Sequence, residues 1–197
     1  KSLRGLQMDK LKNIISKNNK TFYDYRTKKV QSIWLRLFFT VIISMFLTFM
    51  FSAIDNSFID AVLTVQSILV GFSFSVLFFL LSGAKIKSVN EGSIEQGQKV
   101  KKLKTLSEEL FYNVSYYNLV AILSVLVSLL YLLPEMDSSR IPTMVLEYFK
   151  LIYTWVEIII RAIFYFLVIE SMYTFWRTVN RASFFFTEKL SLGADIG

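Results

Sequence analysis

The sequence predicts an all-α, polytopic membrane protein with four transmembrane helices. Hydrophobic residues make up 54% of its 197 residues, and they are concentrated in four long blocks with most of the charged residues between them. A helix needs about 20 apolar residues to cross the hydrocarbon core of a bilayer. The helices of a soluble bundle would instead keep a charged stripe on the face exposed to water. The second block has no charged residue, so a membrane location explains the pattern better.

The amino-terminal arm, residues 1–31, is polar and basic. Over 10–29 its apolar residues recur at roughly helical spacing, with lysines between them: Leu11, Ile14, Ile15, Phe22 and Tyr25. This pattern is typical of an amphipathic helix on an anionic membrane surface. An arm that binds a partner, or that is disordered, is the alternative. The arm shows no apolar core of a cleavable signal peptide, and Met8 is one candidate for the natural start.

The transmembrane domain is predicted over residues 32–176. Each of its four apolar blocks is close to the length that crosses a bilayer. The spans are expected at about 32–53, 61–83, 115–133 and 149–174.

The segment between the second and third spans, residues 84–114, is longer than a simple turn. The glycines of "GSIEQGQ" (92–98) are expected to break any helix there. A helix should then begin near residue 99 and run to residue 133, which makes it about 50 Å long at 1.5 Å per residue. This long third helix would project beyond the membrane. A tail, 177–197, follows the fourth span.

The lysines and arginines predict the orientation. Residues 1–31 contain nine of them, the 84–114 segment contains six and the tail contains three, whereas 54–60 contains none and 134–146 contains only Arg140. Cytoplasmic segments carry the excess of lysine and arginine. Both termini and the central segment are therefore predicted to be cytoplasmic.

The composition argues against an enzyme. Without cysteine or histidine, the chain lacks thiol nucleophiles, the commonest zinc ligands and the usual acid–base side chain. It also has no phosphate-binding glycine loop and no nucleophile elbow. We therefore expect no catalytic residues, no metal and no cofactor. The net charge of +7 is carried by segments that flank hydrophobic spans, so no direct binding to nucleic acid is expected.

Small and hydroxylated residues recur every four positions inside two of the spans. The first span carries Thr40, Ser44, Thr48 and Ser52, and the second carries Ser67, Gly71 and Ser75. Residues four apart share a helix face. Such stripes favour close helix packing in lipid, either inside the four-helix bundle or between protomers. The alternative is a hydrated path lined by the hydroxyls and closed by phenylalanines such as Phe72, Phe74 and Phe78.

Glu157 and Arg161 interrupt the apolar run of the fourth span. They are four residues apart, so their side chains are predicted to pair on one helix face. A charge inside the bilayer is costly and usually faces another helix or a wet cavity, with Tyr153 or Tyr165 expected nearby. The pair either fixes the rotation of the helix or takes part in conduction or sensing. Arg36 and Glu170 lie nearer the cytoplasmic ends, where snorkelling to water would accommodate them.

The cytoplasmic part of the third helix is predicted to be amphipathic. Val100, Leu103, Leu106 and Leu110 recur at three- and four-residue steps. The charged residues beside them are candidates for binding a partner: Lys99, Lys101, Lys102, Lys104, Glu108 and Glu109. Such a helix can dock another protein or a neighbouring subunit. The alternative is that it packs against its own bundle.

Three stretches of the chain form a recognisable series: "VQSILVGFSFSVLFFLLSG", "LSEELFYNVSYYNLVAIL" and "FYFLVIESMYTFWRTVNR". Together they resemble small four-span membrane proteins of prokaryotic anti-phage defence. Their order and the Asn-Val-Ser-Tyr signature at 113–116 are similar to the membrane subunit of Kiwa-type systems. Membrane accessories of RNA-guided, RNA-targeting CRISPR systems are a neighbouring possibility. The resemblance covers roughly residues 30–181.

The resemblance implies a homo-oligomer of the bacterial inner membrane, with a tetramer as one arrangement. Such a protein would contact membrane lipid and work with a cytoplasmic effector protein that acts on nucleic acid. We therefore expect a sensor or scaffold that recruits or regulates this effector. A pore or channel that perturbs ion gradients is the alternative function.

Overall fold

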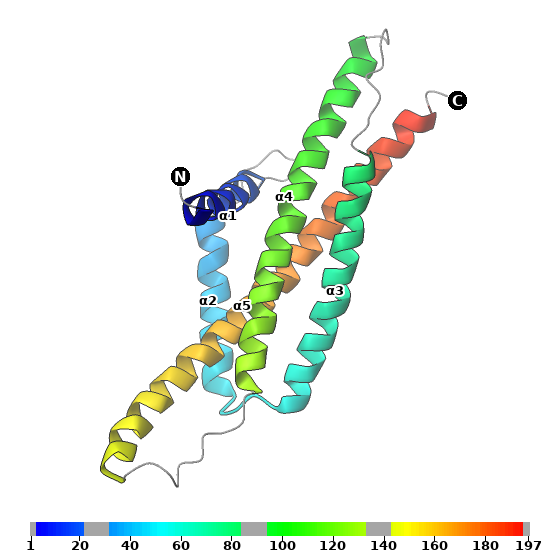
Figure 1. Ribbon diagram of the computed structural model, residues 1–197. Coiled ribbons are helices and arrows are strands. Elements are labelled where there is room, and N and C mark those ends of the chain that lie inside the picture. Colours follow the sequence, from blue (N-terminus) through cyan, green and yellow to red (C-terminus); the bar gives the residue numbers. More distant parts are fainter. Residues whose placement is uncertain (1–2, 22–31, 84–93, 133–142, 195–197) are drawn as a thin grey trace. The chain divides into compact units, whose positions relative to one another are not determined.

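The computed structural model describes residues 3–21, 32–83, 94–132 and 143–194. Within these ranges every regular element is a helix, and no described residue lies in a strand. The helices, labelled in Figure 1, are α1 (Leu3–Lys20), α2 (Ile33–Met50), α3 (Asn56–Gly83), α4 (Ile94–Tyr131) and α5 (Thr143–Ala194). The predicted all-α class is confirmed.

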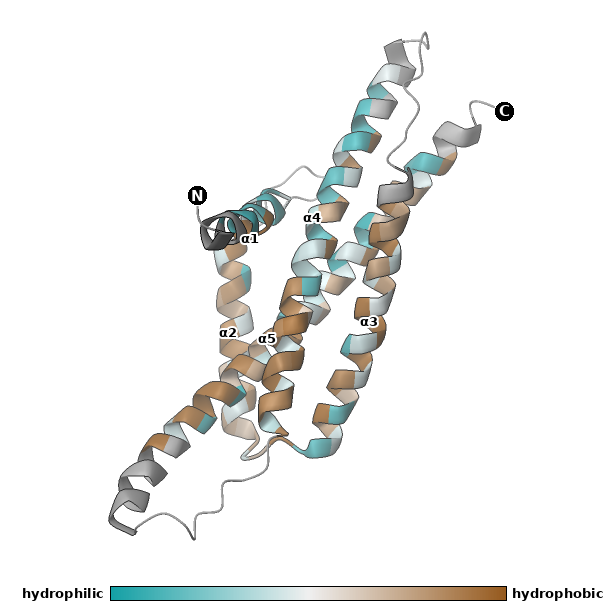
Figure 2. Cartoon of the chain, in the orientation of Figure 1, coloured by the Kyte–Doolittle hydropathy of each residue, from teal (hydrophilic) through white to brown (hydrophobic). Residues whose placement is uncertain are grey.

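Four of these helices are long and apolar enough to cross a membrane. The qualifying stretches are Ile33–Met50, Asn56–Leu80, Lys101–Tyr131 and Thr154–Leu190. Figure 2 shows the contrast in hydropathy, since α2 and α3 are mostly brown whereas the described part of α1 is largely teal. The expectation of four membrane-spanning helices preceded by a polar helix is thus confirmed by length and composition. The orientation of the chain stays a prediction.

The boundaries of the first two spans differ from those expected. Helix α2 ends at Met50 rather than at residue 53, so Ser52 of the predicted stripe lies outside the helix. Helix α3 begins at Asn56, where the backbone N–H groups of Phe58 and Ile59 donate to the carbonyl oxygen of Asp55. Aspartate is a favoured residue just before a helix. An apolar count misses this polar first turn.

Helix α4 begins at Ile94 and includes Gly97. The expectation that the glycines of residues 92–98 break any helix is therefore wrong at Gly97. A Cβ added at Gly97 would meet nothing within 4 Å, so the residue is not needed for a turn or a close approach. A glycine inside a helix costs only about 1 kcal/mol relative to alanine. The packing of the apolar residues that follow outweighs this cost. Gly92 lies outside the described residues.

The two terminal helices also differ from expectation. Helix α5 continues past the predicted span (149–174) and through most of the predicted tail to Ala194, because Ala182 and Phe185 are buried core residues. Helix α1 confirms a helix in the arm, but it ends at Lys20. Phe22 and Tyr25, the later residues of the expected amphipathic pattern, lie outside the described residues.

The chain divides into two compact units. The first unit comprises residues 1–33, 69–119 and 172–197, and the second comprises 34–68 and 120–171. The core of the first unit joins α3, α4 and α5 through Val76, Leu80, Leu103, Leu106, Leu110, Val114, Ala182 and Phe185. The core of the second unit centres on Ile59, Val62, Phe164 and Tyr165.

Candidate functional site

Arg161 of the second unit binds three acceptors at once. Its guanidinium donates to the Glu157 carboxylate at 2.6 Å, as the four-residue spacing predicted. It also donates to the carbonyl oxygen of Phe51 at 2.6 Å and to that of Ser52. The last carbonyls of a helix have no partner within the helix, and a cation there is favourable to the helix dipole. Arg161 therefore closes the end of α2 as well as neutralising Glu157.

The burial of the two charges is unequal. The Arg161 side chain is 7% exposed, whereas that of Glu157 is 35% exposed. The hydroxyl of Tyr131 lies 3.4 Å from the backbone carbonyl oxygen of Glu157, so a tyrosine of α4 contacts this site. Tyr165, one of the two tyrosines expected nearby, is buried in the core of the same unit. The side chain of Tyr153 lies outside the described residues.

A second ion pair of the same unit joins α2 to α5. Arg36 and Glu170 lie 2.9 Å apart, with side chains 15% and 2% exposed. The expectation that both snorkel to water is therefore wrong for Glu170. The pair was missed because its members are far apart in the sequence. The signal was present, since each charge interrupts an apolar run and the two are opposite in sign.

The two stripes of small residues behave differently. Thr40, Ser44 and Thr48 of α2 are buried, and their hydroxyls donate to carbonyl oxygens four residues earlier at 3.1, 2.7 and 2.8 Å. These hydroxyls are satisfied inside a packed surface, which supports the packing interpretation for α2.

The α3 stripe, by contrast, is exposed. Ser67 and Ser75 donate to carbonyl oxygens of their own helix, and a Cβ added at Gly71 would meet nothing within 4 Å. The buried polar residues of α3 are instead Gln66 and Ser73. The Gln66 side-chain amide donates a hydrogen bond to the Ser171 hydroxyl in the second unit, and the Ser73 hydroxyl donates one to the Asn118 amide oxygen in the first. The predicted stripe thus marks the surface of α3 and not its packed face.

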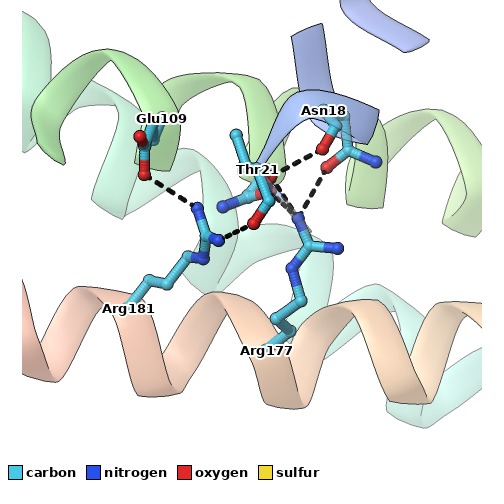
Figure 3. A network of polar contacts seen from close by, with 6 residues as sticks. Asn18, Thr21, Glu109, Arg177 and Arg181 are labelled. Atoms are coloured by element: carbon cyan, nitrogen blue, oxygen red, sulfur yellow. Dashed lines mark hydrogen bonds and ion pairs between the residues drawn. The ribbon is translucent and has the colours of Figure 1, made fainter. Parts of the chain in front are cut away.

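The first unit contains a polar network at the end of α1, shown in Figure 3. Arg177 of α5 donates to Asn113 of α4 and to Asn18 and Thr21 at the end of α1. Arg181, one turn further along α5, donates to the carbonyl oxygen of Thr21 and to Glu109 at 3.1 Å. Hydrogen bonds that involve a charged group are the stronger ones. Both arginines therefore hold α1 against α4 and α5.

This network was not predicted. Three of its residues are almost fully buried: Asn18 at 0%, Asn113 at 1% and Thr21 at 4% exposure. Asn113 is the first residue of the Asn-Val-Ser-Tyr signature noted in the sequence, but its contacts with Arg177 and α1 could not be predicted from that signature. Buried polar side chains require partners, and here the partners come from three separate helices.

Removing Arg177 should loosen α1. Arg177→Met deletes charge-assisted hydrogen bonds worth about 1.5–3 kcal/mol each, so amide hydrogen exchange in α1 peptides should accelerate by about tenfold or more. Lys104→Met, which removes an exposed charge of the same unit, is the control and should leave α1 unchanged. Equal exchange in both variants would contradict the role of the network.

The six predicted partner-binding residues divide into distinct groups. Lys102 pairs with Glu188 at 3.0 Å, and Glu109 pairs with Arg181. Lys101, Lys104 and Glu108 are exposed, while the side chain of Lys99 lies outside the described residues. The leucines between them, from Leu103 to Leu110, are buried in the core of the unit. The leucines therefore pack against their own bundle, whereas Lys101, Lys104 and Glu108 stay accessible.

These features define a multi-pass α-helical membrane protein with buried ion pairs. Comparison with protein-family models, curated proteins and solved structures finds no match to the chain. Among the residues that the structure describes, no group of three or more histidine, cysteine, aspartate or glutamate side chains could hold a metal ion.

Proposed function

We propose that the protein is a membrane-embedded scaffold or sensor of an anti-phage defence system, which recruits or regulates a cytoplasmic effector protein. The observation that carries the proposal is the accessible charged face of α4. Lys101, Lys104 and Glu108 are exposed on a helix whose other face is fixed by buried leucines. A helix that presents charged side chains at its surface favours an interaction steered by electrostatics. The defence role rests on the resemblance of the sequence.

Self-association is part of this proposal. The exposed stripe of Ser67, Gly71 and Ser75 on α3 supports it, because small residues let helices approach closely in lipid. The proposal also requires that the protein forms a homo-oligomer in the inner membrane of bacteria.

Charge reversal on α4 tests the recruiting surface. In cells that carry the gene with its genomic neighbours, Lys101→Glu with Lys104→Glu should reduce protection against phage by about tenfold or more, since like charges across an interface cost several kcal/mol. The matched control is Lys10→Glu with Lys17→Glu, which makes the same change of charge on exposed residues of α1. Membrane levels of both variants must equal those of the wild type. Full protection by the α4 variant would contradict the proposal.

A pore or channel is the second candidate function. The observation that favours it is the partial exposure of Glu157, at 35%, inside a candidate span. Acidic side chains in rings select cations in pores. The test is to record currents from the purified oligomer in a planar bilayer. Discrete currents that Glu157→Gln alters would favour the pore or channel over the scaffold.

A further inference from the structure

A cavity beside α1 takes no part in the proposed recruiting surface. This cavity is a shallow hollow open to the surroundings, with a volume of about 510 Å³, and it is lined by Lys12, Ile15, Ser16, Asn19, Lys20 and Ile33. The first five residues are spaced so that they share one face of α1. Ile33 is the first residue of α2. All six belong to the first unit.

The lining combines positive charge with an apolar wall. Lys12 and Lys20 are exposed cations, Ser16 and Asn19 supply hydroxyl and amide donors, and Ile15 and Ile33 are apolar. Among the residues that the structure describes, the lining contains no acidic side chain. Lysines occupy the last turn of α1, where they offset the negative end of the helix dipole. This chemistry fits a phosphodiester that is joined to an apolar group.

The cavity lies at the beginning of the first candidate span. Ile33 is also the first residue of the first candidate span, Ile33–Met50. Trp34 follows it and is 83% exposed. Tryptophan is enriched at the level of the lipid headgroups. A spanning helix that begins at Ile33 would place the cavity near the level of the lipid phosphates.

We propose that this cavity binds the headgroup of an acidic phospholipid. The two lysines contact the phosphate, Ser16 and Asn19 donate to its oxygens or to the glycerol, and the isoleucines pack against the beginning of the acyl chains. The arm is thereby attached to one lipid at a defined site, in addition to any diffuse attraction of its charges to the membrane.

The test is lipid binding to the full-length protein in mild detergent, measured by native mass spectrometry. The probes are dioleoyl phosphatidylglycerol and dioleoyl phosphatidylcholine, with inorganic phosphate as a competitor. Phosphatidylglycerol should bind more tightly than phosphatidylcholine, and excess phosphate should not displace it. Lys12→Gln with Lys20→Gln should weaken phosphatidylglycerol binding by about 25-fold, since each lysine near an anionic lipid contributes about fivefold.

The control is Lys10→Gln with Lys17→Gln, which removes the same charge from exposed residues of α1 that do not line the cavity. It should retain most of the affinity. Equal weakening by both double variants would overturn the proposal in favour of diffuse attraction. Displacement by inorganic phosphate would assign the cavity to a free anion, and dimerisation that depends on Lys12 and Lys20 would assign it to a second copy of the chain. The thermal midpoint of Lys12→Gln with Lys20→Gln should stay unchanged, because both lysines are exposed.

Discussion

Replacing Arg161 with leucine should lower the free energy of unfolding by about 3 kcal/mol. Removing one partner of a buried ion pair typically costs 3–5 kcal/mol, and the lower end applies because Glu157 keeps 35% exposure and can be hydrated. The variant also leaves the carbonyl oxygens of Phe51 and Ser52 without their guanidinium donor. Unfolding of the purified protein in mixed micelles, followed by circular dichroism, measures the loss.

Two further variants separate the capping role of Arg161 from its charge pairing. Glu157→Gln should cost less than Arg161→Leu, because the glutamine amide oxygen can still accept from Arg161, which also keeps the carbonyl oxygens of Phe51 and Ser52. Arg161→Lys should fall between the other two variants, since one ammonium group cannot reproduce a planar fork that reaches several oxygens. If Arg161→Leu and Glu157→Gln cost the same, pairing alone would explain Arg161, and its contact with the end of α2 would carry no weight.

The parts of this fold that follow a local pattern were predictable. The spans follow from apolar length, and the contact of Glu157 with Arg161 follows from helical spacing. Helix α4 was expected from the steps between Leu103 and Leu110, yet its start at Ile94 was not, because the cost of Gly97 is small compared with the packing that follows.

The candidate sites depend on contacts between residues far apart in the chain, which a local pattern does not contain. The stripe on α2 lies in a packed surface of the chain, whereas that on α3 is exposed, since Gln66 and Ser73 take the buried positions there. Arg177 resembles an ordinary basic residue after a span, and only the fold brings Asn18 and Asn113 to it. A single sequence shows which polar residues are costly to bury, and the fold shows which partners offset the cost.

The pair formed by Arg36 and Glu170 should show the strongest coupling in the second unit. Arg36→Leu leaves the Glu170 carboxylate, 2% exposed, without its partner at 2.9 Å, and should cost about 3–5 kcal/mol. Glu170→Leu should cost less, because Arg36 retains 15% exposure and a long side chain that can reach water.

The double variant Arg36→Leu with Glu170→Leu removes both charges from the helix surface. Replacing a buried ion pair with apolar residues is often neutral or stabilising, and two leucines suit a candidate span better than two ions. Its stability should therefore lie within about 1 kcal/mol of the wild type, well above the sum of the single losses. The same micelle unfolding assay completes the cycle. Additive losses would show that each residue acts through separate contacts, whereas recovery in the double variant would show that the two charges are needed only for one another.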